Sequence, residues 1–224
     1  MRKFLAAMLC LGLLCGPVRA EETEKYVALT FDDGPSGRFT RKLLAGLEER
    51  DTKATFLLCG YRIAQAPELT RQILESGHEI GLHGYSHKSM DRLCAGELEA
   101  EIDKTLALLP EDMAPAFLRP PGGCTNSTVC AIAKEKGLAI LCWSVDPRDW
   151  ANHDAAAVER SVISHVKDGD VILLHDMSES SVDAALVIVD TLKEQGFTFV
   201  TVSELAELRG VTPEPGKVYS HFPP

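Results

Sequence analysis

Short apolar runs alternate with amphipathic segments along most of the chain. Helix-like stretches begin at Glu97, Ala155 and Ser180, and in the first of them the apolar residues share one face: Leu98, Ile102, Leu106 and Leu109. Seven apolar runs between such stretches predict short buried strands: Tyr26–Phe31, Ala54–Cys59, Glu79–Leu82, Ala116–Leu118, Leu138–Trp143, Val171–Leu174 and Thr198–Val202. Because strands alternate with helices, the pattern predicts an α/β fold of parallel strands, either a barrel or an open doubly wound sheet.

The first twenty residues are typical of an export signal. A basic start precedes the apolar stretch Phe4–Cys15, and Ala20 closes a plausible cleavage site. A lipoprotein anchored through Cys10 or Cys15 is the alternative, which the leucine before each cysteine disfavours. We therefore expect an exported protein, extracellular or associated with the cell envelope, with a cleaved signal at 1–20, one domain at 21–210, and an extended or loosely attached proline-rich tail at 211–224.

Charge and cysteine content restrict the class of partner. The formal net charge is −10, and loss of the signal, which holds three basic residues and no acids, would make it −13. This balance disfavours nucleic acid and anionic lipid, and a neutral glycan is an easier fit. No later segment has the roughly twenty apolar residues that a membrane-spanning helix needs.

Five cysteines follow the signal, and their pairing cannot be derived from the sequence. Cys124 and Cys130 are close enough to close a short loop, whereas Cys59 and Cys142 lie in apolar runs and resemble core thiols. Neither these nor Cys94 form a Cys-x-x-Cys pair, so a cysteine zinc site is not expected.

Residues able to carry chemistry follow the predicted strands. Since the carboxyl ends of parallel strands meet at one edge, these residues should lie close together. In chain order they are Asp32 and Asp33, His83 and His87, Arg119, Asp149, and His175.

His83 and His87 are four residues apart, so one helical turn would bring both rings to the same side. A carboxylate from another strand end would complete a three-ligand metal site with positions open for water and substrate. One of Asp32 and Asp33 would then bind the cation while the other stays ionised as a proton acceptor. The alternatives are a histidine pair on a solvated helix face and two aspartates that only cap the following helix.

Five segments together resemble the polysaccharide deacetylases of carbohydrate esterase family four, the NodB-homology domain. They are "TFDDG" at 30–34, "HGYSH" at 83–87, "RPPGG" at 119–123, "DPRDW" at 146–150 and "LLH" at 173–175, and they spread over most of Tyr26–Leu208. The resemblance implies a deformed (β/α) barrel of about seven parallel strands. It also implies a hydrolase of amide bonds that uses a metal to remove acetyl groups from amino sugars.

The resemblance assigns roles by motif position. Asp33, His83 and His87 would hold a divalent metal, zinc in the first instance, with cobalt, nickel or manganese as alternatives. Asp32 would be the general base and His175 the general acid. Arg119 would hold Asp32 in place, and Asp149 would orient His175 and favour its protonated form.

Further residues would contact the substrate. Leu173 and Trp150 would wall a pocket for the acetyl methyl group, and a backbone N–H near Gly122 or Gly123 would bind the developing oxyanion. The full set of expected substrate contacts is Pro121, Gly122, Gly123, Trp150 and Leu173.

The chain departs from the family pattern at two glycines. Gly84 replaces a serine or threonine whose hydroxyl would brace the metal loop, and Gly122 replaces a residue that is often bulky, which would widen the groove. A disulfide between Cys124 and Cys130 would stiffen that wall. The remaining histidines lack comparable neighbours and are interpreted as surface or structural: His78, His153, His165 and His221.

The leading hypothesis is an exported, monomeric N-deacetylase of a polymer containing GlcNAc or MurNAc. Peptidoglycan is the first candidate substrate, while chitin-like glycans and O-acetylated xylan stay open. A hydrolase of cyclic or other small amides on the same fold is one alternative. A glycan-binding protein without catalysis is another, although all the residues that catalysis would need are present.

Overall fold

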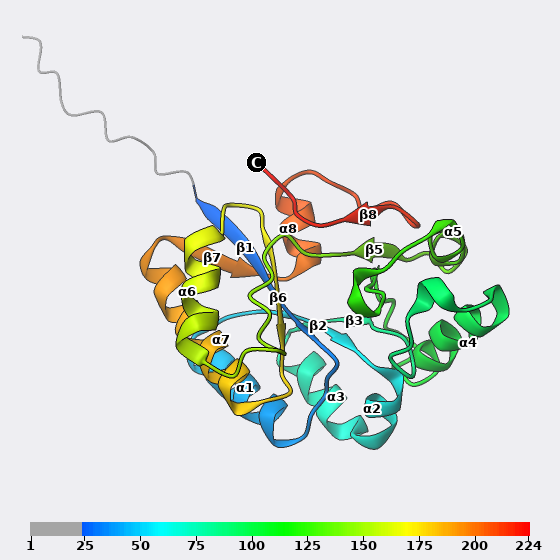
Figure 1. Cartoon of the computed structure of the whole chain (residues 1–224), viewed down its shortest axis with the longest axis horizontal. Helices are drawn as coiled ribbons and strands as arrows, with labels where there is room; N and C mark the ends of the chain where they lie inside the picture. Colours follow the sequence, from blue (N-terminus) through cyan, green and yellow to red (C-terminus); the bar gives the residue numbers. More distant parts are fainter. Residues whose placement is uncertain (1–23) are drawn as a thin grey trace, which may run out of the picture.

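The computed structural model describes residues 24–224, so the expected signal segment and the alternative anchor cysteines lie outside the described residues. A parallel sheet forms the centre of the molecule (Figure 1), and seven of its strands coincide with the predicted apolar runs. The strands are β1 (Lys25–Asp32), β2 (Thr55–Leu58), β3 (Glu79–Leu82), β4 (Phe117–Leu118), β5 (Ala139–Leu141), β6 (Val171–His175), β7 (Phe197–Val200) and β8 (Val218–Tyr219).

The sheet curls into the deformed barrel expected from the sequence. Its strand order is β6-β1-β2-β3-β4-β5-β8, and β7 pairs with the first half of β1. An isolated parallel bridge between Val145 and Ile172 connects the segment after β5 back to β6. All the strand pairings are parallel, so the carboxyl ends of β1 to β6 surround one end of the barrel.

Helices cover the outer face of the sheet (Figure 1), except the last, which packs with the apolar residues of the barrel interior. They are α1 (Arg38–Glu49), α2 (Gly60–Gln65), α3 (Pro67–Glu75), α4 (Ala95–Leu106), α5 (Ser127–Glu135), α6 (Ala155–His165), α7 (Glu179–Glu194) and α8 (Val202–Leu208), with 3₁₀ turns at Met90–Arg92 and Pro121–Gly123. Side-chain caps start several of them: Asn126 accepts from Val129 N–H, and Ser178 from Ser181 N–H.

Alternation along β1 decides what faces the barrel interior. Ala28 packs inside with Phe117, Leu141 and Val171, which explains why the lower barrel is apolar. Continuing by twos along the same strand, Thr30 and Asp32 follow on the same face, because side chains in a strand alternate. The barrel interior therefore changes from apolar to polar toward the carboxyl ends of the strands.

The C-terminal segment is docked, which corrects the expectation that it could be loosely attached. Val218 and Tyr219 add β8 to the edge of β5. Phe222 is 1% exposed and stacks on Tyr219 with ring centroids 5.5 Å apart. Its apolar contacts close the lower end of the barrel, so the tail belongs to the packed domain.

All five cysteines among the described residues are free thiols, so the expected bridge between Cys124 and Cys130 is not formed. Cys59 is buried, as predicted for a core thiol, whereas Cys142 is only partly buried. Burial raises the pKa of both thiols. Between residues 24 and 224 no helix combines the length and apolar character needed to cross a bilayer.

Candidate active site

The two aspartates of the first motif point in different directions from the end of β1. Asp32 pairs in register with His175 at the end of β6, which brings residues far apart in sequence to neighbouring positions. Asp33 leaves the strand with a φ of 73°, in the left-handed region. Non-glycine residues rarely adopt this conformation, and they tend to do so at functional sites where the surroundings hold them.

Arg119 fixes Asp32 from inside the barrel. Its guanidinium is fully buried and donates to Asp32 Oδ1 at 2.7 Å and to Thr30 Oγ1 at 2.8 Å. The other guanidinium nitrogens donate to the carbonyls of Leu141 and Cys142, at 3.3 and 2.9 Å. These four bonds compensate the buried positive charge and leave Asp32 Oδ2 as the oxygen nearer the histidines, 3.8 Å from His83 Nε2.

Asp33, His83 and His87 form the one group of candidate metal ligands found within residues 24–224, in agreement with the predicted triad. Asp33 Oδ1 lies 3.4 Å from His83 Nε2 and 3.1 Å from His87 Nε2. The expected helical turn is absent, because Gly84 and His87 both have positive φ, at 76° and 61°, and the histidines lie on a loop. The rings nevertheless converge, with centroids 5.2 Å apart.

The cluster fits a divalent ion such as zinc. Two ligands bound tetrahedrally at about 2.0–2.1 Å lie about 3.3 Å apart, close to the separations found here. His83 Nδ1 donates to the Arg119 carbonyl at 2.7 Å, which turns the Nε2 lone pair toward the cluster. Asp33 Oδ1 is buried and has no hydrogen-bond donor among the described residues, so a cation would supply the partner that it lacks.

The pKa shifts in the cluster are those of a carboxylate shared by two imidazoles. Burial works to raise the pKa of Asp33, but the close imidazoles of His83 and His87 outweigh it and hold that pKa well below its usual range. The close approach of the Asp33 carboxylate likewise raises the pKa of His87. A metal ion would replace the protons that this arrangement attracts.

Glu101 on α4 braces the loop that carries His83 and His87, a role that was not assigned from the sequence. Its Oε2 accepts from the backbone N–H groups of Tyr85 and Ser86, at 2.9 and 2.7 Å, and its Oε1 accepts from Ser86 Oγ at 2.7 Å. Ser86 therefore supplies a loop-bracing hydroxyl two positions after Gly84. The spacing could have indicated this role, because Glu101 lies three residues after the buried Leu98 and therefore shares its face of the helix.

His175 and Asp149 form the second half of the site. Asp149 is fully buried, and its two oxygens accept from His175 N–H at 2.9 Å and from His175 Nδ1 at 2.8 Å. Burial alone would lower the pKa of His175, but the hydrogen bond and the charge of Asp149 raise it to about 8. Asp176, the next residue, does not contact this pair: its carboxylate accepts from Thr40 Oγ1 and lies against Gly34.

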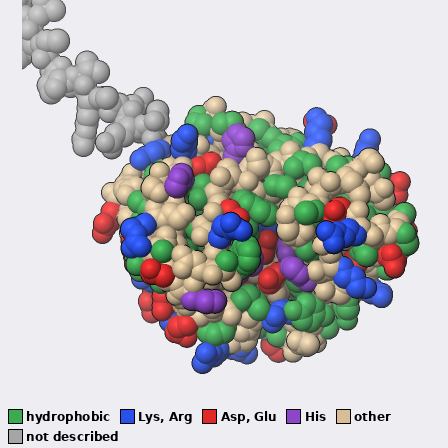
Figure 2. Space-filling model, in the orientation of Figure 1, with side chains coloured by type: hydrophobic (Ala, Val, Ile, Leu, Met, Phe, Trp, Pro, Cys, Tyr) green, Lys and Arg blue, Asp and Glu red, His purple; other side chains and the backbone are tan. Residues whose placement is uncertain are grey.

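These groups meet in a pocket of about 580 Å³. Figure 2 shows acidic and histidine side chains close together near the centre of the visible face. Of the expected substrate contacts, Gly122, Trp150 and Leu173 line the pocket. Pro121 and Gly123 do not, because Gly123 packs behind the wall against Trp143 and its N–H already donates to the Pro120 carbonyl at 2.8 Å. Three lining residues were not assigned from sequence: Trp143, Asp146 and Arg148.

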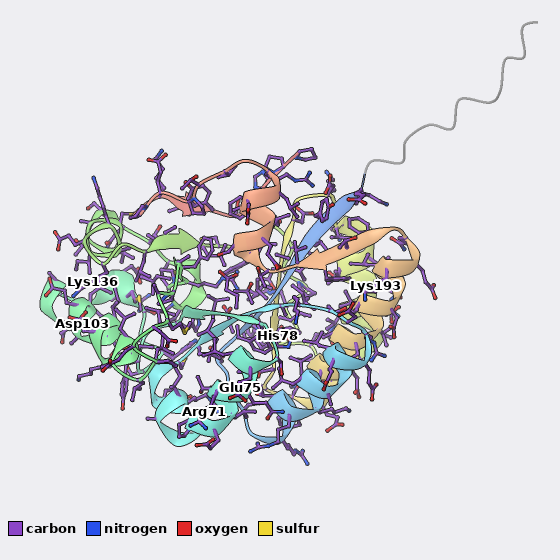
Figure 3. All side chains as sticks on the ribbon, turned by 180° about the vertical axis from the view of Figure 1, so that it is seen from behind. Arg71, Glu75, His78, Asp103, Lys136 and Lys193 are labelled. Atoms are coloured by element: carbon purple, nitrogen blue, oxygen red, sulfur yellow. The ribbon has the colours of Figure 1, made fainter. Side chains whose placement is uncertain are left out.

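The histidines set aside from the sequence lie apart from this pocket. His78 is buried behind the sheet (Figure 3), accepts from Ala54 N–H at 3.2 Å, and has a pKa lowered to about 4 by burial. His165 is exposed at the end of α6, where its Nδ1 contacts the Ser161 carbonyl. Both fit the structural or surface role inferred for them.

Known proteins are similar to this chain over most of its length. The chain is 41% identical over 188 residues to a peptidoglycan-N-acetylglucosamine deacetylase of Bacillus cereus, covering 81% of this chain and 88% of that one. It is 34% identical to the peptidoglycan-N-acetylmuramic acid deacetylase PdaC of Bacillus subtilis, covering 84% of this chain but 40% of the relative. A solved family 4 acetyl xylan esterase from Clostridium thermocellum, in complex with a cobalt ion, superposes with a TM-score of 0.83 at 34% identity and covers 89% of this chain and 100% of the esterase.

The family model for polysaccharide deacetylase matches residues 19–141, which include the two aspartates, both histidines and Arg119. Asp149 and His175 lie beyond the matched range, and the fold brings them to the same pocket. The resemblance drawn from the five motifs is therefore confirmed, and the chain belongs to the polysaccharide deacetylase family of amide-bond hydrolases.

Proposed function

We propose that this protein is an exported, zinc-dependent N-deacetylase acting on the amino sugars of peptidoglycan. One observation carries the proposal: a three-ligand metal cluster shares a pocket with two proton-transfer groups, Asp32 and His175, each held by its own partner. Amide hydrolysis needs a strong nucleophile, a polarised carbonyl and a proton for the departing amine. The site offers a separate group for each requirement.

A divalent metal held by the cluster would lower the pKa of water and polarise the acetyl carbonyl. Asp32, anchored through Oδ1 by Arg119, accepts the proton of the attacking water at Oδ2. His175, kept protonated by Asp149, donates its Nε2 proton to the amide nitrogen as the C–N bond breaks. The water oxygen joins the acetyl carbon, so the products are acetate and a free amino sugar. Each proton transfer typically contributes about 10²- to 10⁴-fold.

The wall of the pocket suits the small acetyl group. Leu173 on β6 is almost fully buried, and the exposed Trp150 lines the same pocket. We assign these two side chains to contact with the acetyl methyl, because an apolar methyl gains free energy when it leaves water for an apolar surface. The carbonyl and nitrogen of the amide would then face the polar groups.

Peptidoglycan is the preferred substrate because the named activities of the Bacillus relatives are on that polymer. O-acetylated xylan is the second candidate, favoured by the structural similarity to an acetyl xylan esterase. The predicted signal segment supports a place in the cell envelope or outside the cell, where a wall polymer would be met. Sequencing the N-terminus of protein recovered from the envelope and culture medium tests export, and an intact residue 1 in all fractions would contradict it.

The decisive experiment measures acetate release by zinc-loaded protein from peptidoglycan fragments, chito-oligosaccharides and acetylated xylan. We expect turnover on peptidoglycan fragments, loss of one acetyl mass per deacetylated sugar, and loss of turnover in Asp32→Asn. Release from xylan alone would favour the second candidate. Release from none of the three, with zinc, cobalt, nickel or manganese, would reject catalysis and leave a glycan-binding protein.

A further inference from the structure

The pocket carries one positive side chain that the proposed chemistry does not use. Arg148 is the one lysine or arginine that lines the pocket, and its side chain is exposed. Its guanidinium forms no ion pair with any Asp or Glu of residues 24–224. The other arginine near the reacting groups, Arg119, is buried and fully engaged with Asp32 and backbone carbonyls. Arg148 therefore has its charge available for a bound molecule.

The position of Arg148 is set by the loop that also sets the general acid. Its φ is 58°, its N–H donates to Asp146 Oδ1 at 2.8 Å, and its carbonyl accepts from Ala151 and Asn152 N–H, both at 3.0 Å. The next residue, Asp149, is the buried partner of His175. A left-handed non-glycine residue persists where its surroundings hold it, and here the hydrogen bonds of the Arg148 N–H and carbonyl do so. The backbone from which the Arg148 side chain extends is therefore held in a fixed position next to the partner of His175.

Arg148 lies beside an exposed aromatic surface. Its guanidinium carbon is 5.4 Å from the centroid of a Trp150 ring, and Trp150 is 55% exposed at the rim of the pocket. An indole face suits the apolar face of a sugar ring, and a planar guanidinium suits a carboxylate, to which it can donate two parallel hydrogen bonds. Neutral polymers such as chitin or xylan have no group that would use the cation.

We propose that Arg148, beside Trp150, recognises a carboxylate on the polymer unit next to the sugar that is deacetylated. This inference rests on the proposed function and narrows its substrate to acidic, muramic-acid-containing glycans. Two sources of carboxylate fit the chemistry: the lactyl group of the neighbouring muramic acid and the peptide stem attached to it. The negative charge of the rest of the protein makes one available cation in the pocket more selective, because acidic groups bound elsewhere would meet repulsion.

The test compares matched GlcNAc–MurNAc oligosaccharides that differ in charge. One set has free lactyl carboxylates, a second has the same carboxyls converted to amides, and a third carries the peptide stem. We expect the wild-type kcat/KM to be about tenfold higher for the free carboxylate than for its amide, which corresponds to about 1.4 kcal/mol. The difference should reside mainly in KM. It should shrink as the salt concentration rises from about 0.05 to about 0.5 M, because the Debye length falls from about 14 to about 4 Å and the exposed charge pair is screened. In Arg148→Gln the ratio should fall to about one.

Arg71→Gln is the matched control, since Arg71 lies on α3 (Figure 3) and does not line the pocket; its ratio should equal that of the wild type. A preference for the stem-bearing set alone would assign the carboxylate to the peptide. Equal turnover of all three sets by the wild type, or a preference retained in Arg148→Gln, would overturn the inference. If no glycan releases acetate, the proposed function fails. The inference is then tested by calorimetry, as the ratio of the affinities for the free and the amidated oligosaccharides in the wild type and in Arg148→Gln.

Discussion

Replacing Asp149 by asparagine should move the alkaline limit of activity. Both Asp149 oxygens bond to His175, one through the backbone N–H and one through Nδ1, and the residue is buried away from solvent. Asparagine keeps the size of the side chain and removes its charge. The substitution removes the negative charge that raises the pKa of His175, while the burial that lowers that pKa remains.

The magnitude follows from the pKa of His175, which is about 8 in the wild-type protein. Without the carboxylate it should fall to the ordinary value of about 6.5 or below, a change of at least ~1.5 units, or ~2 kcal/mol. In the proposed mechanism His175 acts in its protonated form, so activity should be present below its pKa and lost as pH rises through that value. At pH 8 the protonated fraction would drop from about a half to about 3%, a loss of roughly 15-fold before any loss of ring orientation.

The assay is kcat/KM for acetate release between pH 5 and 10, because this parameter reports the pKa values of the free enzyme. The descending limb should lie near 8 for the wild type and at or below about 6.5 for Asp149→Asn. Asp146→Asn is the control: it removes a carboxylate from the same loop, and the descending limb of its pH profile should stay near 8. A uniform fall in rate with an unmoved limb in Asp149→Asn would refute the reasoning, since it would mean that Asp149 only positions the ring.

Three further predictions concern the metal loop and the packing beneath it. Chelation or His87→Ala should abolish turnover and remove bound zinc measured by elemental analysis, whereas His165→Ala should change neither; equal losses would contradict the ligand assignment. Glu101→Gln should weaken zinc binding by about 10- to 100-fold in a competition titration with a chelating dye, because the loop that presents both histidines loses a charged brace; unchanged affinity would argue against that brace. Burial raises the pKa of Asp176 to about 6 in the folded protein, whereas in the unfolded chain this carboxyl ionises near its ordinary value of about 4. The folded protein is therefore destabilised as pH rises from about 4 through 6. Asp176→Asn should therefore raise the free energy of unfolding by up to about 3 kcal/mol at pH 8 and by little at pH 4 in urea titrations, and a gain of the same size at both pH values would exclude the buried charge as its cause.

The positions of the strands and most chemistry-bearing residues could be predicted from the sequence. Strands covered on both faces appear as continuous apolar runs, so seven of the eight strands were visible in one-dimensional patterning. Sites in parallel α/β folds lie at the carboxyl ends of strands, so Asp32 and His175 could be brought to one edge before their register was known. Local order along the chain was enough for both inferences.

Contacts between distant segments decided the rest. The loop from His83 to His87 is not a helical turn, because Gly84 and His87 are left-handed and Glu101, from another element, holds the two residues between them. Spacing alone does not encode that contact. β8 pairs with β5 although its proline-rich surroundings suggested a loosely attached tail, since the docking depends on a buried Phe222. Arg148 acquired significance only once the fold placed it at the pocket without an acidic partner. The sequence by itself determined which groups were available for catalysis, and the tertiary structure decided their orientation, their charge state and their neighbours, because these depend on burial and on long-range hydrogen bonds.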